Sequence, residues 1–493
     1  MTFQKALVPL FNMPMLVRVL GWLMLIEAMF MLLPLTVCLL YGESDWIAFA
    51  GGAGLTGLCG FLMARNARPH INHLGKRDGY LLTASVWVVF SIFGMVPFIL
   101  SATHVSITDA FFEAMSGFTT TGSTVIPQEV VLSHGMHVWR ALMQWLGGLG
   151  IILFTIAVIP MLNHSGGLQM INAEMAGITS DKIRPRISQT AKSLWGLYII
   201  LTMVLTLLLW AGPMDFFDSI CHALGTISTG GYTTAGNGVA HFHSVYTKAV
   251  ITVFMFLGSV NFTLIFRAVT GDWQRVRHND IFIKYILVIL VATALFVLTI
   301  IFRSQAYTWR HVTIDPLFQV VSLISSTGYM LSAYPTWGPF VLGLGFLMMI
   351  CGGCSGSTTG GVKLDRIVDT FKNCRNELMH CIYPHRVYAV RSNGKAVSPD
   401  TINKISVFLT MFALVTAAGT LALTMTGVDI YSSFFSVLSC VTNDGLGAGV
   451  IEGGVPIPAL PAAAKWVLTA AMLIGRLEIF TILLLFTRSF WRR

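Results

Sequence analysis

Four short segments of the sequence combine hydroxyl side chains with a closing glycine, which are residue types that suit cation coordination. They span residues 114–122, 222–230, 320–328 and 437–445 when aligned on the last glycine. Backbone carbonyl oxygens can replace the hydration shell of a cation, and glycine lets such a backbone turn without Cβ strain. We therefore predict a cation filter from the ends of the four segments: Thr120, Thr121, Gly122, Ser228, Thr229, Gly230, Ser326, Thr327, Gly328, Asn443, Asp444 and Gly445.

Each filter segment is preceded by an acid and followed by a second glycine motif. The acids are Asp109, Asp215 or Asp218, Asp315 and Asp429, which suit the positive end of a short helix. The motifs after the loops are centred on Gly147, Gly258, Gly352 and Gly475, which follow the filter glycines by 25, 28, 24 and 30 residues. The pattern predicts a unit of helix, short pore helix, extended loop and helix that occurs four times.

Composition places these units in a membrane. The chain has 493 residues, of which 55% are hydrophobic and only 11% charged, with a mean hydropathy of +0.73. A soluble chain usually carries about 25% charged residues, and a membrane span needs about 20 apolar ones. The predicted spans are 15–41, 45–64, 79–101, 137–162, 188–212, 244–268, 281–304, 336–362, 402–428 and 462–488.

Basic residues predict the orientation of the chain. Of the 31 lysines and arginines, 25 fall into alternate loops and the two ends of the chain, so the positive-inside rule predicts cytoplasmic termini and an even number of crossings. The first span is too long for a cleavable signal peptide. Basic loops at membrane ends also explain the net charge of +9 without a nucleic-acid partner.

The predicted fold is an all-α polytopic membrane protein, with two N-terminal transmembrane helices and four helix–pore loop–helix repeats in a pseudo-four-fold arrangement. The expected divisions are 1–78 for the two helices and a basic loop, then 79–187, 188–280, 281–400 and 401–493 for the repeats. The third repeat has a broken inner helix.

The broken helix and one isolated arginine are candidates for a gate. Five glycines fall within residues 352–361, where each would cost a regular helix about 1 kcal/mol relative to alanine. The segment is either a cytoplasmic loop that begins early or an intramembrane gate below the filter. Arg476 in an apolar segment either faces the ion path or pairs locally with Glu478. The gate prediction comprises Gly352, Gly353, Gly356, Ser357, Thr358, Thr359, Gly360 and Arg476.

With these motifs the chain resembles the Trk/Ktr/HKT superfamily of cation transporters, and most closely its TrkH-type proteins of bacteria. The resemblance covers nearly the whole chain and implies potassium uptake across the inner membrane, because glycine rather than serine stands at the first filter position, Gly122. It also implies a homodimer with one pore per protomer, resting on a cytosolic ring of nucleotide-binding TrkA-type subunits. Loop 363–404 is either a docking surface for that ring or ordinary positive-inside charge. The chain itself shows no nucleotide site and calls for no cofactor beyond the transported potassium ion.

Several alternatives stay open. Asp444 stands where the other segments have Thr121, Thr229 and Thr327; it either braces the loop from behind or faces the ion, and it puts selectivity at the fourth repeat in doubt. Asn443 likewise replaces a hydroxyl. A zinc site at Cys374, His380, Cys381 and His385 has no standard ligand spacing. No nucleophile–base arrangement or P-loop suggests an enzyme. A sodium-conducting relative and a proton- or sodium-coupled symporter remain the rival transport functions.

Overall fold

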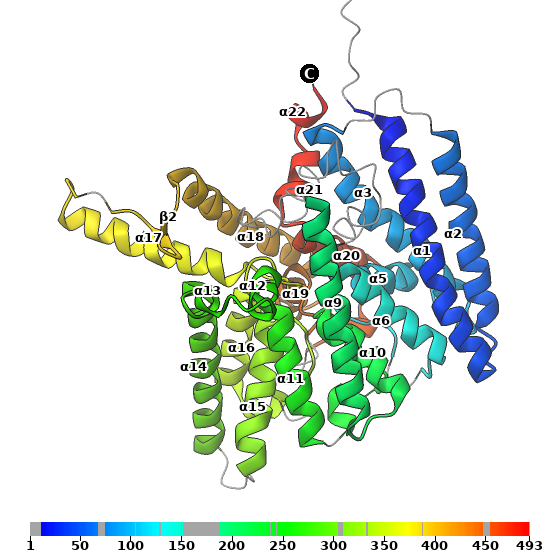
Figure 1. Cartoon of the computed structure of the whole chain (residues 1–493), viewed down its shortest axis with the longest axis horizontal. Coiled ribbons are helices and arrows are strands. Elements are labelled where there is room, and N and C mark those ends of the chain that lie inside the picture. Colours follow the sequence, from blue (N-terminus) through cyan, green and yellow to red (C-terminus); the bar gives the residue numbers. More distant parts are fainter. Residues whose placement is uncertain are drawn as a thin grey trace, which may run out of the picture.

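The computed structural model is built almost entirely of helices, which confirms the predicted all-α polytopic class (Figure 1). It describes residues 11–67, 74–103, 105–127, 130–148, 150, 187–236, 238–242, 244–303, 309–331, 334–386, 388–446 and 454–492. Six helices in this part of the chain are long and apolar enough to cross a membrane, or seven if one bent pair counts as a single span. The count of ten crossings stays a prediction.

Two N-terminal helices pack side by side along one flank of the molecule (Figure 1). They are α1 (Met13–Tyr41) and α2 (Trp46–Asn66). Gly21 and Gly60 allow their close approach, since a Cβ on Gly21 would lie 2.7 Å from the Gly60 carbonyl oxygen. Small residues at such contacts let transmembrane helices associate. The loop between them reaches the rest of the bundle through Glu43, which accepts hydrogen bonds from the His134 and Gly135 N–H groups, at 2.8 and 3.3 Å, at the start of α6 (His134–Gly148).

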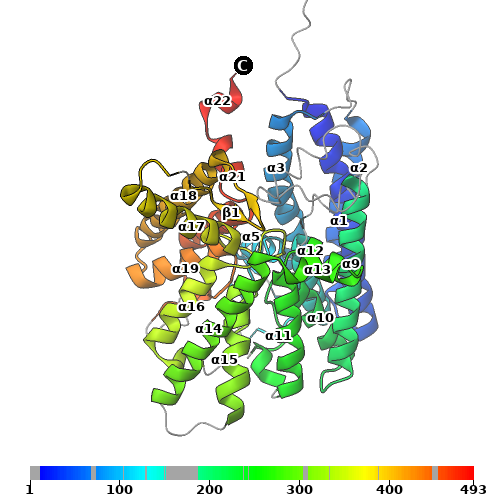
Figure 2. The same cartoon turned by 60° about the vertical axis from the view of Figure 1, so that its left-hand side comes forward.

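The remaining helices follow the predicted order of outer helix, pore helix and inner helix four times. Figure 2 shows the second unit (green) beside the third (yellow-green). The first unit has α3 (Lys76–Gly94), α4 (Val96–Leu100), α5 (Ile107–Phe118) and α6. The second has α9 (Ile187–Trp210), α10 (Phe216–Ile227), α11 (Val245–Ser259) and α12 (Phe262–Val269). The third has α14 (Asp280–Arg303), α15 (Trp309–Ile324) and α16 (Pro339–Cys351). The fourth has α18 (Pro399–Thr424), α19 (Ile430–Thr442), α20 (Ala462–Arg476) and α21 (Phe480–Leu485).

Three inner helices break: the break in the third repeat is predicted, whereas continuous spans are predicted for the second and fourth. In 244–268 the chain turns by 109° between α11 and α12, because the Asn261 side chain accepts from the Thr263 N–H at 2.8 Å and starts a new helix. In 336–362 the helix ends at Cys351, as its glycines suggest. In 462–488 Glu478 and Ile479 adopt left-handed backbone between α20 and α21. The predicted span 137–162 continues past Gly148 into residues outside the described ranges.

Short elements connect and flank the repeats. They are α13 (Trp273–Arg277), α17 (Leu364–Ile382), α22 (Arg488–Trp491), the antiparallel strands β1 (Arg391–Ser392) and β2 (Lys395–Ala396), and the 3₁₀ turns 238–242, 334–337 and 457–459. Helix α17 carries an exposed polar face and extends outward from the bundle (Figure 1).

Candidate ion pathway

The four pore helices end in the same way. Beyond the last turn of each, one N–H group returns to a carbonyl five residues earlier and folds the chain into the filter segment. These bonds run from Thr121 to Ser116 (2.9 Å), Gly230 to Gly225 (2.8 Å), Thr327 to Ser322 (3.0 Å) and Asp444 to Ser439 (3.0 Å). Predicted acids cap two of the helices, since the Asp215 and Asp429 side chains accept from the N–H groups of Asp218 and Ser432. The residues that donate the returning bonds are therefore structurally equivalent.

This equivalence corrects the predicted alignment of the second segment by one residue. Left-handed backbone occurs two residues before the filter glycine in every segment, at Thr120, Thr229, Ser326 and Asn443. It recurs at the glycines Gly122, Gly231, Gly328 and Gly445. Gly231, not Gly230, therefore matches the other three, and Gly230 matches Thr121, Thr327 and Asp444. The sequence contains both candidates, because Gly230 and Gly231 are adjacent, but an alignment on the dipeptide Thr-Gly selects Gly230.

The four segments meet in a closed ring. A Cβ added to Gly122 would lie 2.1 Å from the carbonyl oxygen of Gly230, and one on Gly231 would lie 1.9 Å from that of Thr327. The same holds from Gly328 to Asp444 at 1.9 Å and from Gly445 to Thr121 at 2.1 Å. Each glycine thus faces the carbonyl oxygen of the next repeat, in the order one, two, three, four and back to one. A Cβ at any of these positions would collide with that oxygen.

Two of the hydroxyl groups next to the ring lie close to a second hydroxyl of their own segment. Thr121 Oγ1 lies 2.8 Å from Thr119 Oγ1, and Thr327 Oγ1 lies 2.7 Å from Ser325 Oγ. In the second repeat Gly230 lacks a side chain, and Gln144 of α6 fills this space and donates to the Gly230 carbonyl at 2.6 Å. The Gln144 amide therefore binds one of the four carbonyl oxygens that face a filter glycine.

Asp444 departs from this pattern. The residue is fully buried, and neither carboxylate oxygen has a hydrogen-bond partner in the described part of the chain. Bracing by hydrogen bonds, one of the two readings of this side chain, therefore has no support in the described contacts. Asn443 does brace the segment, since its amide donates to Thr121 Oγ1 at 2.9 Å and to the Met472 carbonyl at 3.0 Å.

A buried network that the sequence analysis missed joins the first two repeats. The Glu113 carboxylate of α5 accepts from Val125 N at 2.8 Å and from the Tyr232 hydroxyl at 2.9 Å. Arg140 lies 3.4 Å from the same carboxylate and stacks over the Tyr232 ring. The only hint in the sequence is that Arg140 is one of the few basic residues outside the predicted cytoplasmic loops.

Residues 352–363, which we call the 352–363 loop, cross directly beneath the ring. Thr358 Oγ1 donates to the Gly258 carbonyl at 3.0 Å and lies 3.2 Å from Thr229 Oγ1. The Gly360 N–H donates to Ser326 Oγ at 2.7 Å, and a Cβ on Gly360 would lie 2.0 Å from the Thr442 carbonyl oxygen. The loop therefore contacts filter segments of three repeats, which excludes a purely cytoplasmic loop.

Arg476 joins the 352–363 loop to the first repeat. Its guanidinium donates to the Thr358 carbonyl at 2.9 Å and to the carbonyls of Gly147 and Gly148 at 2.6 and 2.8 Å. Glu478 instead forms an ion pair with Arg366 of α17. The alternative prediction of a local ion pair between Arg476 and Glu478 is therefore wrong, and Arg476 lies beside the loop under the ring.

No group of three or more histidine, cysteine or acidic side chains that could hold a metal ion occurs within the described ranges. Cys374, His380, Cys381 and His385 are all described, so the zinc alternative has no support.

Comparison with known proteins agrees with this architecture. Residues 58–493 match the TrkH family model, described as a cation transport protein. The chain is 34% identical over 478 residues to "Trk system potassium uptake protein TrkH" of Escherichia coli strain K12, covering 96% of this chain and 98% of that protein. A second relative with the same name, from Vibrio parahaemolyticus, is 34% identical over 482 residues, or 97% and 99% of the two chains. The crystal structure of the potassium transporter TrkH from Vibrio parahaemolyticus superposes with a TM-score of 0.87 at 31% identity, covering 98% of this chain and all of that one. The chain therefore belongs to the TrkH family of cation transport proteins and is not an enzyme.

Proposed function

We propose that this chain conducts potassium ions across the bacterial inner membrane into the cell, through a filter at the ring of four repeats. The closed cycle of glycine-to-carbonyl contacts supports this function most directly. Such a ring of backbone oxygens can replace the hydration shell of a monovalent cation. The relatives of the chain are named as potassium uptake proteins, and the resemblance that favours potassium through Gly122 points the same way. Gly231 takes the place of Gly230 in this filter, while Gly230 supplies a carbonyl.

The 352–363 loop and Arg476 form the gate. Gly352, Gly353, Gly356, Ser357, Thr358, Thr359 and Gly360 bring small or hydroxyl side chains under the filter, where they can move aside at little cost. A fixed positive charge at Arg476 opposes the passage of a cation. The bonds of Arg476 to Thr358 and to α6 hold the gate closed until the loop shifts.

The proposal also covers the assembly of the chain and its orientation in the membrane. The chain forms a homodimer with both termini in the cytoplasm, and the five-part division from 1–78 to 401–493 describes its modules. A nucleotide-binding TrkA-type ring docks on the cytoplasmic side, where α17 extends from the bundle. The name of the relatives as parts of a Trk system supports a regulatory partner of this kind.

Rubidium uptake into proteoliposomes tests the proposal. Vesicles that contain the chain and are loaded with potassium should take up external rubidium, driven by the outward potassium gradient. Potassium added outside should compete with rubidium far better than sodium does. Equal competition by sodium would favour the sodium-conducting alternative. Uptake that requires a proton or sodium gradient would favour coupled symport. Absence of uptake, with and without the cytosolic ring, would overturn the proposal.

A further inference from the structure

A cavity of about 680 Å³ lies on the far side of the 352–363 loop from the filter. Cys354 and Ser355 of the loop line it, whereas Thr358 and Gly360 contact the filter segments. Its wall includes residues from all four repeats, and the first repeat contributes Tyr80, near the start of α3.

The charged residues that line the cavity are three basic ones, Arg267, Arg366 and Lys404, and three acidic ones, Asp365, Asp369 and Glu478. Arg366 is paired with Glu478, and Lys404 with Asp400 at 2.5 Å. Asp365 accepts one bond, from the Ser355 N–H. Asp369 is only 7% exposed, yet its Oδ1 atom has no hydrogen-bond partner in the described part of the chain.

Basic side chains also act on Asp369 without pairing with it. Burial raises the pKa of the Asp369 carboxyl above its ordinary value, and the charges of Lys372 and Lys284 act against this rise. Among the described residues no ion pair within 4.0 Å includes Asp369, and Lys372 donates to the Arg391 carbonyl. A buried carboxylate oxygen without a partner is costly, so such a group calls for a donor or a cation.

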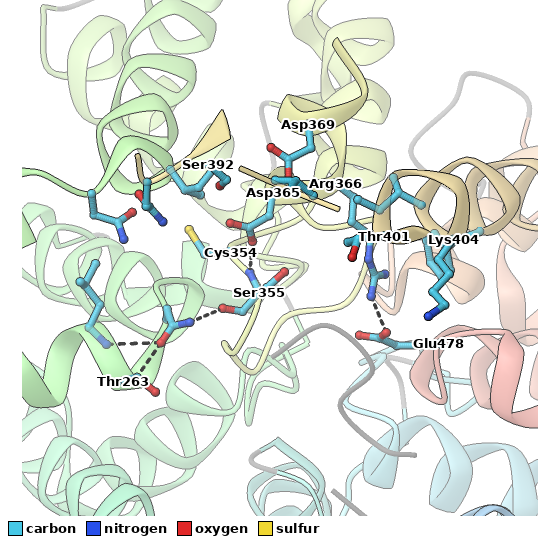
Figure 3. A pocket seen from close by; sticks show the side chains of 18 of the residues that line it. Thr263, Cys354, Ser355, Asp365, Arg366, Asp369, Ser392, Thr401, Lys404 and Glu478 are labelled. Carbon is cyan, nitrogen blue, oxygen red and sulfur yellow. Dashed lines mark hydrogen bonds and ion pairs between the residues drawn. The ribbon is translucent and has the colours of Figure 1, made fainter. Parts of the chain in front are cut away.

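Asp365 and Asp369 are placed to act together. They are four residues apart on α17, so their side chains lie on one face of the helix. Figure 3 shows the two side chains one above the other on α17, with Ser355 below them. Asn261, Ser392 and Asn393 line the same cavity, and the Oδ1 atoms of Asn261 and Asn393 accept from the N–H groups of Thr263 and Asp280. Oxygen ligands suit alkali and other hard cations.

We propose that Asp365 and Asp369 form a second cation site, which holds a partly hydrated potassium ion between the 352–363 loop and the cytoplasm. The inference rests on the proposed function, because the ion reaches the site through the filter. The carboxylates would lower the energy of the ion where it has just left the carbonyl ring, and would draw it away from Arg476.

Thallous ion is a suitable probe because it replaces potassium and scatters anomalously. Crystals of the full chain grown in thallous nitrate should show peaks at the filter and one peak beside Asp365 and Asp369. In Asp369→Asn the cavity peak should fall about ten-fold in occupancy at limiting thallium, since a unit charge is lost at contact distance, while the filter peaks stay. Asp272→Asn is the matched control: it removes a carboxylate that is paired with Arg275, and neither residue of that pair lines the cavity.

The outcomes separate the two proposals. Filter peaks with an empty cavity in the wild-type protein overturn the second site alone, and the filter peaks also show that each variant is folded. A cavity peak that persists unchanged in Asp369→Asn overturns the assignment to this carboxylate. A cavity peak seen with manganous ion but not with thallous ion overturns the monovalent site. Absence of filter peaks overturns the proposed function instead.

Discussion

The Arg476 guanidinium lies 2.9 Å from the Thr358 carbonyl oxygen, and so joins the inner helix of the fourth repeat to the 352–363 loop of the third. The same side chain holds the Gly147 and Gly148 carbonyls of the first repeat. One residue thus links three of the four repeats directly beneath the carbonyl ring.

Replacing this charge should loosen the gate. Arg476→Ala removes both the electrostatic barrier and the tie to Thr358, so we expect rubidium flux without the cytosolic ring to rise about ten-fold, which corresponds to about 1.4 kcal/mol off the barrier. Arg275→Ala, at an exposed arginine of α13 paired with Asp272, serves as the control. Equal flux in wild-type and Arg476→Ala vesicles would contradict a gating role.

The corrected register predicts unequal effects at two adjacent glycines. Gly231 has a φ of +81° and faces the Thr327 carbonyl oxygen, so Gly231→Ala should reduce rubidium uptake to the level of empty vesicles. At Gly230 the three atoms nearest to a new Cβ all belong to the side chain of Gln144 and not to the backbone. Gly230→Ala should retain part of the uptake, and the double variant with Gln144→Ala should retain more.

The reverse order, with Gly230 more sensitive than Gly231, would restore the alignment that the sequence alone suggests. Protein yield and detergent stability of both variants must match for the comparison to hold.

Asp444 should lower stability while it raises cation affinity. Its buried carboxylate has no hydrogen-bond partner among the described residues, and an unsatisfied buried polar group costs about 1–3 kcal/mol. Asp444→Thr, which copies the residue of two other repeats, should therefore raise the thermal unfolding midpoint. It should also raise the potassium concentration for half-maximal uptake, because a carboxyl group beside the ring is lost. Unchanged half-saturation would show that the carboxylate does not act on the ion.

The Arg366–Glu478 ion pair should stabilise the contact between α17 and the residues that join α20 to α21. Both side chains are largely buried, with exposed fractions of 10% and 16%, so removal of one partner should destabilise the protein by up to about 3–5 kcal/mol. Arg366→Gln or Glu478→Gln should lower the unfolding midpoint, and the double variant should recover part of the loss. Additive losses would show that the pair is not coupled.

Acid should weaken the link between the α1–α2 loop and α6. Burial opposes ionisation of Glu43, but the bonds from His134 and Gly135 outweigh it and lower the pKa of this carboxyl below its ordinary value of 4.5. Glu43 therefore stabilises the fold above pH 4.5, and its contribution is lost as the pH falls through the lowered pKa. Thermal unfolding midpoints between pH 3 and 7 should show this acid-side decrease, and Glu43→Gln should reduce it.

The sequence alone determined the helices, the four repeated units and the position of the filter segments, because apolar length, acids at helix starts and recurring glycines are local signals. Tertiary structure decided the rest. Gly230 and Gly231 are equally plausible in the chain, and the returning bond from Gly230 to Gly225, with the positive φ of Gly231, identifies Gly231 as the one that completes the ring. The pairing of Glu478 with Arg366 rather than Arg476 depends on residues 112 positions apart. Such contacts follow from how the repeats close around one axis, and no local pattern encodes that closure.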